Sequence, residues 1–418
     1  MKKLLVLILA MSMLVFIIAC DKNDDDDDDS TGPSGPTSFN ITLVESQLTP
    51  ADANPEIVRM VPGTDDQAVF IASATNQLYP ITYSNDGFSI GNPFDVDPGS
   101  ATAEMTSIDV SIVIDGENYV AVCVAEVDCE LGSVHLVRYS DNEIVATVGV
   151  GYNPDGCSFT KDGSYLVVAC EDDREDRECK PEDRHGGSVA IIDLRNGVEN
   201  AELLEDFKVD WDVDSEPEHA ETAANGTTVV SIQETSQIMI FNANDVPLTE
   251  GEYIVVDLPD DGAGIAAEPD GLYISPDGTL ALISNERNGT FQMMELPTGN
   301  LLGTPYIIED DLPDGYNVDA REPKKRTEPE ECSLVSYGDK LYAILALQES
   351  HGVIVYDVTD PANPEFDSIA PCGVDYENDI EMEKSSIGTE GLSAHATNGM
   401  VLVANEREGS ITLLRAGE

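Results

Sequence analysis

Residues 269–286 read PDGLYISPDGTLALISNE, and this stretch decides the fold. Two short runs rich in apolar residues, typical of strands, flank the turn sequence Pro276-Asp277-Gly278. Residues 290–295 (TFQMME) and 301–308 (LLGTPYII) can supply a third and a fourth strand. Four antiparallel strands joined by short turns form one blade of a β-propeller, so this stretch predicts a blade.

An acid opens the first strand of this stretch, a glutamate follows the second strand, and the same pair recurs along the chain. The two acids lie sixteen residues apart in four places, namely Asp155/Glu171, Glu218/Glu234, Asp270/Glu286 and Glu390/Glu406. Two looser copies pair Glu104 with Glu126 and Glu330 with Glu349. Counting by the opening acid gives seven units, which begin at Glu56, Glu104, Asp155, Glu218, Asp270, Glu330 and Glu390. Such a period, roughly 50 to 60 residues, is typical of propeller blades.

The sequence therefore predicts an all-β fold, a seven-bladed β-propeller with four-stranded antiparallel blades, over residues 38–418. The last unit contains only three strands before the chain ends. Residues 39–44 (FNITLV) are predicted to supply its fourth strand, so that no blade is left with an unpaired edge. We predict no long helix and no second folded domain.

The first 37 residues are predicted to lie outside the propeller. Residues 1–19 have a basic start and an apolar run, which indicates a signal peptide. Ile17-Ile18-Ala19-Cys20 resembles the lipobox of bacterial lipoproteins, in which the cysteine is lipidated; the alternatives are a simple signal peptide or one membrane helix. Residues 20–37 are predicted to form a lipid-anchored tether, acidic and then rich in Gly, Pro and Ser. We expect an outer-membrane lipoprotein that faces the periplasm or the cell surface. The sequence does not decide which leaflet of the membrane holds the lipid anchor.

The charge of the chain restricts its partners. With 81 Asp and Glu against 21 Lys and Arg, the net charge is −60, which repels nucleic acid and anionic lipid headgroups and favours cations. We therefore expect no nucleic-acid partner, membrane contact through the lipid anchor only, and a monomer that binds an unknown small ligand or surface protein. Adaptation to high salt would produce the same composition.

Eight cysteines are present, and a lipidated Cys20 leaves seven for an oxidising compartment. Three pairs are candidates for disulfides: Cys123 with Cys129, Cys170 with Cys179, and Cys332 with Cys372. A bond between Cys129 and Cys179 is an alternative. Cys157 would remain a buried thiol.

Several blade motifs resemble one known family. Residues 153–163 (NPDGCSFTKDG), 166–171 (LVVACE) and 187–193 (GSVAIID), with 216–218, 231–234, 388–391 and 403–411, are similar to the choice-of-anchor I propellers. The resemblance covers roughly residues 50–418, although single motifs are shared with the wider YVTN and lactonase-like propellers. It implies the propeller fold and a cell-surface anchor, here Cys20, but no established reaction. In the first blade, Thr75-Asn76 stands where the second acid is expected.

On a blade, an acid that opens the first strand and a glutamate that follows the second share one rim of the central channel. We expect the carboxylates there to bind a divalent cation, possible ligands of Ca²⁺ being Glu104, Asp155, Glu171, Glu218, Glu234, Asp270, Glu286, Glu330, Glu349, Glu390 and Glu406. The alternative interpretation is that repeats copy acids whose carboxylates accept hydrogen bonds from loops.

The main functional hypothesis is a binding module without chemistry of its own, which takes Ca²⁺ or a cationic ligand at the acidic channel mouth. The alternative is a metal-dependent hydrolase of lactonase or phosphoesterase type, in which Glu218, His219, Asp270 and Glu330 hold the metal and activate water. A third hypothesis is a purely structural surface module.

Overall fold

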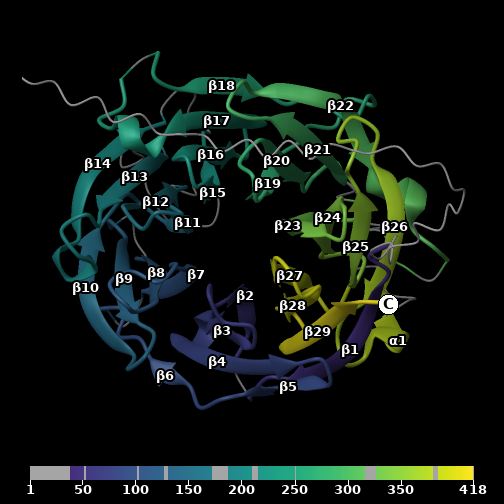
Figure 1. Ribbon diagram of the computed structural model, residues 1–418, viewed down its shortest axis with the longest axis horizontal. Helices are drawn as coiled ribbons and strands as arrows, with labels where there is room; N and C mark the ends of the chain where they lie inside the picture. Colours follow the sequence, from purple (N-terminus) through teal and green to yellow (C-terminus); the bar gives the residue numbers. More distant parts are fainter. Residues whose placement is uncertain are drawn as a thin grey trace, which may run out of the picture. The chain divides into compact units, whose positions relative to one another are not determined.

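Seven antiparallel β-sheets stand around a common axis, each with one strand near the axis and one at the periphery (Figure 1). The computed structural model describes residues 38–417 apart from 51–52, 101–102, 127–129, 172–186, 210–214, 250, 315, 317–325 and 380–384. The predicted all-β, seven-bladed propeller is confirmed.

The strands follow one another outward from the axis in each sheet. The first three sheets contain β2 (Pro55–Met60), β3 (Gln67–Ala72), β4 (Gln77–Ser84) and β5 (Gly87–Ile90); β7 (Glu104–Val110), β8 (Tyr119–Ala125), β9 (Ser133–Arg138) and β10 (Glu143–Gly149); and β11 (Pro154–Phe159), β12 (Tyr165–Cys170), β13 (Ser188–Asp193) and β14 (Glu202–Lys208). The next three contain β15 (Pro217–Thr222), β16 (Thr227–Ile232), β17 (Gln237–Asn242) and β18 (Ile254–Asp257); β19 (Pro269–Ile274), β20 (Leu280–Asn285), β21 (Thr290–Glu295) and β22 (Asn300–Ile307); and β23 (Pro329–Tyr337), β24 (Lys340–Leu347), β25 (Gly352–Asp357) and β26 (Glu365–Pro371).

The ring closes through the N-terminal strand, as predicted. The last sheet contains β27 (Thr389–Ala394), β28 (Met400–Asn405) and β29 (Ser410–Ala416), and β1 (Ile41–Leu48) forms its outer edge. β1 pairs antiparallel with β29 over its whole length. The first sheet differs from the prediction in one detail, because the short strand β6 (Phe94–Asp95) also pairs with β4.

Helical structure is scarce in the described part of the chain. It consists of one α-helical turn, α1 (Tyr376–Asp379), and the 3₁₀ turns η1 (Ser73–Thr75), η3 (Val198–Asn200), η4 (Ala243–Asp245) and η5 (Ile308–Asp311). Among the described residues no helix has the length and apolar character needed to cross a membrane. The predicted signal peptide, Cys20 and the tether lie outside the described residues.

The hydrophobic core is divided into clusters that lie between neighbouring sheets. One cluster joins Ala121 and Leu136 of the second sheet to Leu166 and Ile192 of the third. Both faces of an inner strand are covered in this way, which is why β8 (YVAVCVA) is buried along its whole length instead of alternating. Each blade is therefore fixed in position by its two neighbours.

The five described cysteines are buried free thiols. The predicted bond between Cys332 and Cys372 is wrong, because Cys332 lies on the innermost strand of its sheet and Cys372 follows the outermost one. Three interstrand spacings separate these strands, roughly 14 Å, whereas a disulfide needs Cα atoms closer than about 7 Å. Cys129 and Cys179 lie outside the described residues, and Cys157 is a buried thiol as predicted.

Candidate functional site: a ring of carboxylates at the channel mouth

The opening acids lie in β-bulges near the start of the innermost strands. In the fifth sheet Pro269 pairs with Asn285 and Leu272 with Ile283, so one extra residue is accommodated around Asp270. The same register shift occurs after Pro55, Pro217, Pro329 and Thr389. Proline suits the first position of a strand because it has no N–H to donate, and the bulge turns the following side chain toward the axis.

This register defines a set of equivalent residues, one per blade, which we call the rim ring. Each member directly follows the residue that pairs just before the bulge, and the members are Glu56, Thr106, Asp155, Glu218, Asp270, Glu330 and Glu390. All seven line one cavity of about 70 Å³. The predicted convergence of the opening acids is thus confirmed in six blades.

The second blade departs from the prediction. Met105 pairs with Val124 before its bulge, so Thr106 occupies the ring position and Glu104 lies two residues earlier with an exposed side chain. The Thr106 hydroxyl donates a hydrogen bond to the carbonyl of Pro154. The assignment of Glu104 to the ring was therefore wrong, because a bulge shifts side chains by one position and spacing alone cannot place it.

Glycine brings the ring acids together in pairs. A Cβ on Gly156 would lie 2.3 Å from the Glu218 carbonyl oxygen, and one on Gly271 would lie 2.5 Å from that of Glu330. Neighbouring inner strands approach closely at these points because no side chain separates them. Gly391 permits the same approach to Glu56. The resulting pairs are Asp155 with Glu218, Asp270 with Glu330, and Glu390 with Glu56.

Burial and the charges of neighbouring acids raise the pKa values of five ring acids. Burial, followed by the charges of Glu171 and Asp155, raises the pKa of Glu218 well above its usual range. Burial also raises the pKa of Asp270 to about 6, and burial together with the charge of Glu406 raises that of Glu390 to about 8. The pKa values of Glu56 and Glu330 are raised for the same main reason. With a pKa of about 8, Glu390 holds a proton at neutral pH when no cation is bound.

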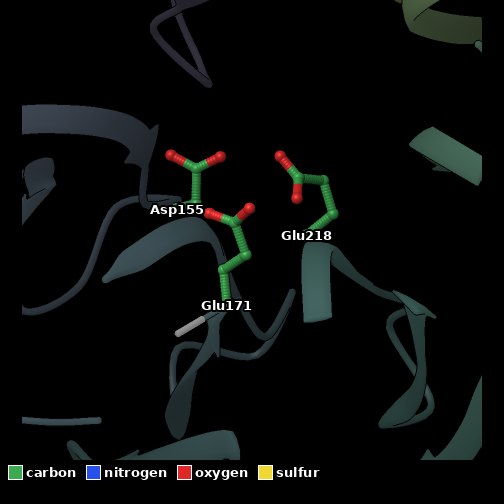
Figure 2. A group of neighbouring side chains, drawn as sticks. All are labelled: Asp155, Glu171 and Glu218. Atoms are coloured by element: carbon green, nitrogen blue, oxygen red, sulfur yellow. The ribbon is translucent and has the colours of Figure 1, made fainter. Parts of the chain in front are cut away.

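Three carboxylates converge at the third and fourth blades. Asp155, Glu171 and Glu218 point toward one another, and each offers an oxygen within 4.8 Å of the other two (Figure 2). Glu218 Oε2 is buried and has no hydrogen-bond partner among the described residues. Ligands of one Ca²⁺ lie about 2.3–2.6 Å from the ion, so two of them are separated by at most about 5 Å. Glu286, Glu328 and Glu330 form a second such group.

Only some of the glutamates predicted to follow the second strands lie at the expected positions. Five residues are equivalent because the backbone N–H of each donates to the carbonyl of the residue two positions before a ring residue, namely Glu171, Gln233, Glu286, Gln348 and Glu406. Glu171, Glu286 and Glu406 are therefore placed as predicted. Gln233 and Gln348 take the positions assigned to Glu234 and Glu349, and both donate to acids of the site, namely Glu286 and Glu390.

The two displaced glutamates have other environments. Glu234 is exposed, whereas Glu349 is fully buried and accepts hydrogen bonds from the Ser385 backbone and from Arg407, at 2.9 and 2.7 Å. Assigning Glu234 and Glu349 to the inner site was wrong, because each second strand ends one residue earlier than the spacing assumed. Arg407 also lies 3.8 Å from Glu328, and Arg287 pairs with Glu268. These arginines pair with acids outside the ring.

The four residues of the hydrolase hypothesis line the same cavity. The structure groups them differently, however. Glu218 pairs with Asp155 and Asp270 with Glu330, while His219 Nδ1 is 3.8 Å from a carboxylate oxygen of Glu331. Glu218 thus belongs to one pair of acids, whereas Asp270 and Glu330 form another.

Residues 56–209 match the choice-of-anchor I domain. The resemblance of the blade motifs to this family is confirmed over these residues. No curated protein sequence matches the chain.

The propeller is also similar to solved structures. Virginiamycin B lyase from Staphylococcus aureus is 12% identical with a TM-score of 0.58, over 90% of this chain and 99% of that one. Hydrazine synthase from Kuenenia stuttgartiensis is 13% identical with a TM-score of 0.59, over 88% and 97%. The U3-55K structure is 10% identical with a TM-score of 0.62, over 91% and 100%. At these identities the likeness shows the fold alone. The fold and the choice-of-anchor I domain together suggest a binding or interaction module.

Proposed function

We propose that the protein is a cell-envelope binding module whose rim ring holds a divalent cation, Ca²⁺ in the first place. The observation that supports this most directly is the group of Asp155, Glu171 and Glu218, whose oxygens lie within 4.8 Å of one another, with the buried Glu218 Oε2 lacking a hydrogen-bond partner among the described residues. Carboxylates at such distances repel one another, and a cation removes both the repulsion and the unsatisfied acceptor.

The donor set favours Ca²⁺ over Mg²⁺. Ca²⁺ accepts six to eight oxygens in variable geometry, whereas Mg²⁺ requires a tighter octahedron and gives up its waters reluctantly. The cavity of about 70 Å³ has room for an ion with one or two waters, since a water occupies about 30 Å³. The six ring acids line it.

The test is a calcium titration of chelator-treated protein, followed by thermal unfolding at pH 7.5. Calcium at one hundred times its dissociation constant should stabilise the fold by about 2.7 kcal/mol and raise the melting temperature by several degrees. NaCl at matched ionic strength separates specific binding from a general effect of salt on an acidic protein. No shift at millimolar Ca²⁺, or an equal shift with NaCl, would contradict the proposal.

Glu218→Gln removes one carboxylate of the group and should weaken calcium binding at least tenfold, with little loss of stability in the cation-free protein. Glu104→Gln is the matched control, because it removes the same charge from an exposed side chain outside the ring and should leave the calcium midpoint unchanged.

The proposed location rests on the sequence. Lipidation of Cys20 would tether the propeller to the outer membrane and expose the rim ring to extracytoplasmic calcium. Cys20→Ala should move the protein from the membrane fraction to the soluble fraction, and an unchanged distribution would contradict this part of the proposal.

A further inference from the structure

A second and larger cavity, of about 450 Å³, lies further along the same inner strands, and we call it the lower cavity. Its volume is within the range of about 300–1,000 Å³ that is typical of small-molecule sites. His219 and Glu331, each one residue beyond the rim ring, line both cavities. The lower cavity thus shares the channel with the rim ring but contains different chemical groups.

Those groups come from one repeated position. The third residue after the ring position lines the lower cavity in six blades, as Arg59, Asp109, Glu221, Tyr273, Ser333 and Ser393. At this position the blades carry a cation, two acids, a phenol and two hydroxyls. A repeated position that carries four kinds of chemical group in six blades suits the recognition of an asymmetric ligand.

Two ion pairs fix the charges of the lower cavity. Arg59 contacts Glu331 through both terminal nitrogens, at 2.9 and 2.5 Å, and Lys161 Nζ lies 3.1 Å from Glu221 Oε1. These pairs balance Glu331 and Glu221, while Asp65 and Asp109 add two further acids to the cavity lining. This differs from the rim ring, where acids face acids.

Three polar groups remain available to a ligand. The Lys161 side chain keeps 42% of its surface exposed and lines the cavity. The Tyr273 hydroxyl has no hydrogen-bond partner among the described residues. Asp109 accepts a hydrogen bond from the Phe159 backbone through Oδ2 only, at 2.8 Å, so Oδ1 is available. Two donors and one acceptor thus line the same cavity, together with the apolar side chains of Met60 and Leu272.

We propose that the lower cavity binds a small organic zwitterion with the size and charge of an amino acid. Its carboxylate would accept hydrogen bonds from Lys161 and Tyr273, and its ammonium group would contact Asp109. Its carbon chain would pack on Met60 and Leu272. Burial lowers the pKa of Lys161, but the charges of Glu221 and then Asp109 outweigh it and raise the pKa, which agrees with the placement of these groups on one cavity. The site differs from the calcium site, and neither depends on the other.

The test uses three probes with the same carbon chain, namely 5-aminopentanoate, pentanoate and pentylamine, in isothermal titration calorimetry with the full chain. 5-Aminopentanoate should bind at least tenfold more tightly than either of the others, because only it satisfies both ends. Equal affinities, or no binding of any probe, would overturn the proposal; preference for pentanoate or pentylamine would likewise overturn it in favour of a simple anion or amine site.

Tyr273→Phe provides the sharpest variant, because it removes only a hydroxyl without a described protein partner and should not disturb the fold. It should weaken 5-aminopentanoate binding about fivefold, as expected for one hydrogen bond. Asp109→Asn should reduce the preference of the lower cavity for 5-aminopentanoate over pentanoate. Glu218→Gln in the rim ring is the control and should leave the affinity for 5-aminopentanoate unchanged, so that failure at one site can be distinguished from failure at the other.

Discussion

The rim ring and the lower cavity are built on the same seven inner strands, only three residues apart, yet the two regions differ in almost every chemical respect. In the rim ring the same carboxylate recurs in six of seven blades, and each acid is paired with another acid. In the lower cavity the acids Glu221 and Glu331 are paired with the cations Lys161 and Arg59.

This difference indicates two kinds of ligand. A set of like groups around an axis suits a small symmetric ion, because every member can serve as an equivalent ligand. A set of unlike groups suits an asymmetric organic molecule, whose ends need different partners. The pairing also matters for stability, since Arg59 and Lys161 neutralise Glu331 and Glu221 in the lower cavity whereas the acids of the rim ring face other acids. Variants in the two regions should therefore change stability in opposite directions.

The largest effect is expected from breaking an ion pair of the lower cavity. Arg59→Met leaves Glu331 mostly buried without its cation and should lower the free energy of unfolding by about 3 kcal/mol, as measured by urea denaturation. The double variant Arg59→Met/Glu331→Leu should recover most of the loss because no lone charge remains. If Arg59→Met cost less than about 1 kcal/mol, the pair would not hold the lower cavity together.

The rim ring should show the opposite response, in the pH dependence of the cation-free protein. The folded-state pKa values of Asp270 and Glu390, about 6 and about 8, lie above the unfolded values, roughly 4. Between the unfolded and the folded pKa values, the folded state holds protons that the unfolded state has lost. The free energy of unfolding is therefore highest at low pH and falls as the pH rises through 6 and 8. Calorimetry in chelator should show the melting temperature falling by at least about 3 °C from pH 5 to pH 8.5.

Calcium and neutral substitutions sharpen this prediction. Saturating Ca²⁺ should remove most of the fall in melting temperature between pH 5 and pH 8.5, and Glu390→Gln should reduce this fall. Tyr273→Phe in the lower cavity should leave it unchanged. A melting temperature that rises over this range would mean that the ring acids are ionised at no cost in the folded protein.

The smallest effect is expected at the one ring position without an acid. The Thr106 hydroxyl donates to the Pro154 carbonyl, so Thr106→Val should cost about 1 kcal/mol in urea denaturation. Thr106→Ser keeps the donor and should cost less. Both variants should leave the calcium midpoint within about twofold, because Thr106 supplies no carboxylate. A tenfold change would place this blade in the cation site after all.

Much of the fold could be predicted from the sequence because turns and strands alternate regularly. Residues 290–295 form β21 as expected, and the N-terminal strand closes the last blade as β1. The position of β1 was less certain, with residues 39–44 predicted and 41–48 observed. A strand that completes a distant sheet has no turn beside it that would fix its limits.

The candidate site could be predicted only where a repeat marked it. Six opening acids were found by their recurrence, whereas Glu104, Glu234 and Glu349 were misplaced because bulges and strand ends differ by one residue between blades. Arg59, Asp109 and Tyr273 were missed since they do not resemble one another. Their constant distance of three residues from the ring position is the signal that could have revealed them, once Thr106 is aligned with the acids.

A crystal structure with Sr²⁺, which replaces Ca²⁺ and scatters anomalously, tests the central claim most directly. We predict an anomalous peak between Asp155, Glu171 and Glu218 that disappears in Glu218→Gln and persists in Glu104→Gln. The absence of a peak there and at Glu286, Glu328 and Glu330, in crystals soaked with millimolar Sr²⁺ at pH 8, would contradict the assignment of the rim ring as a cation site.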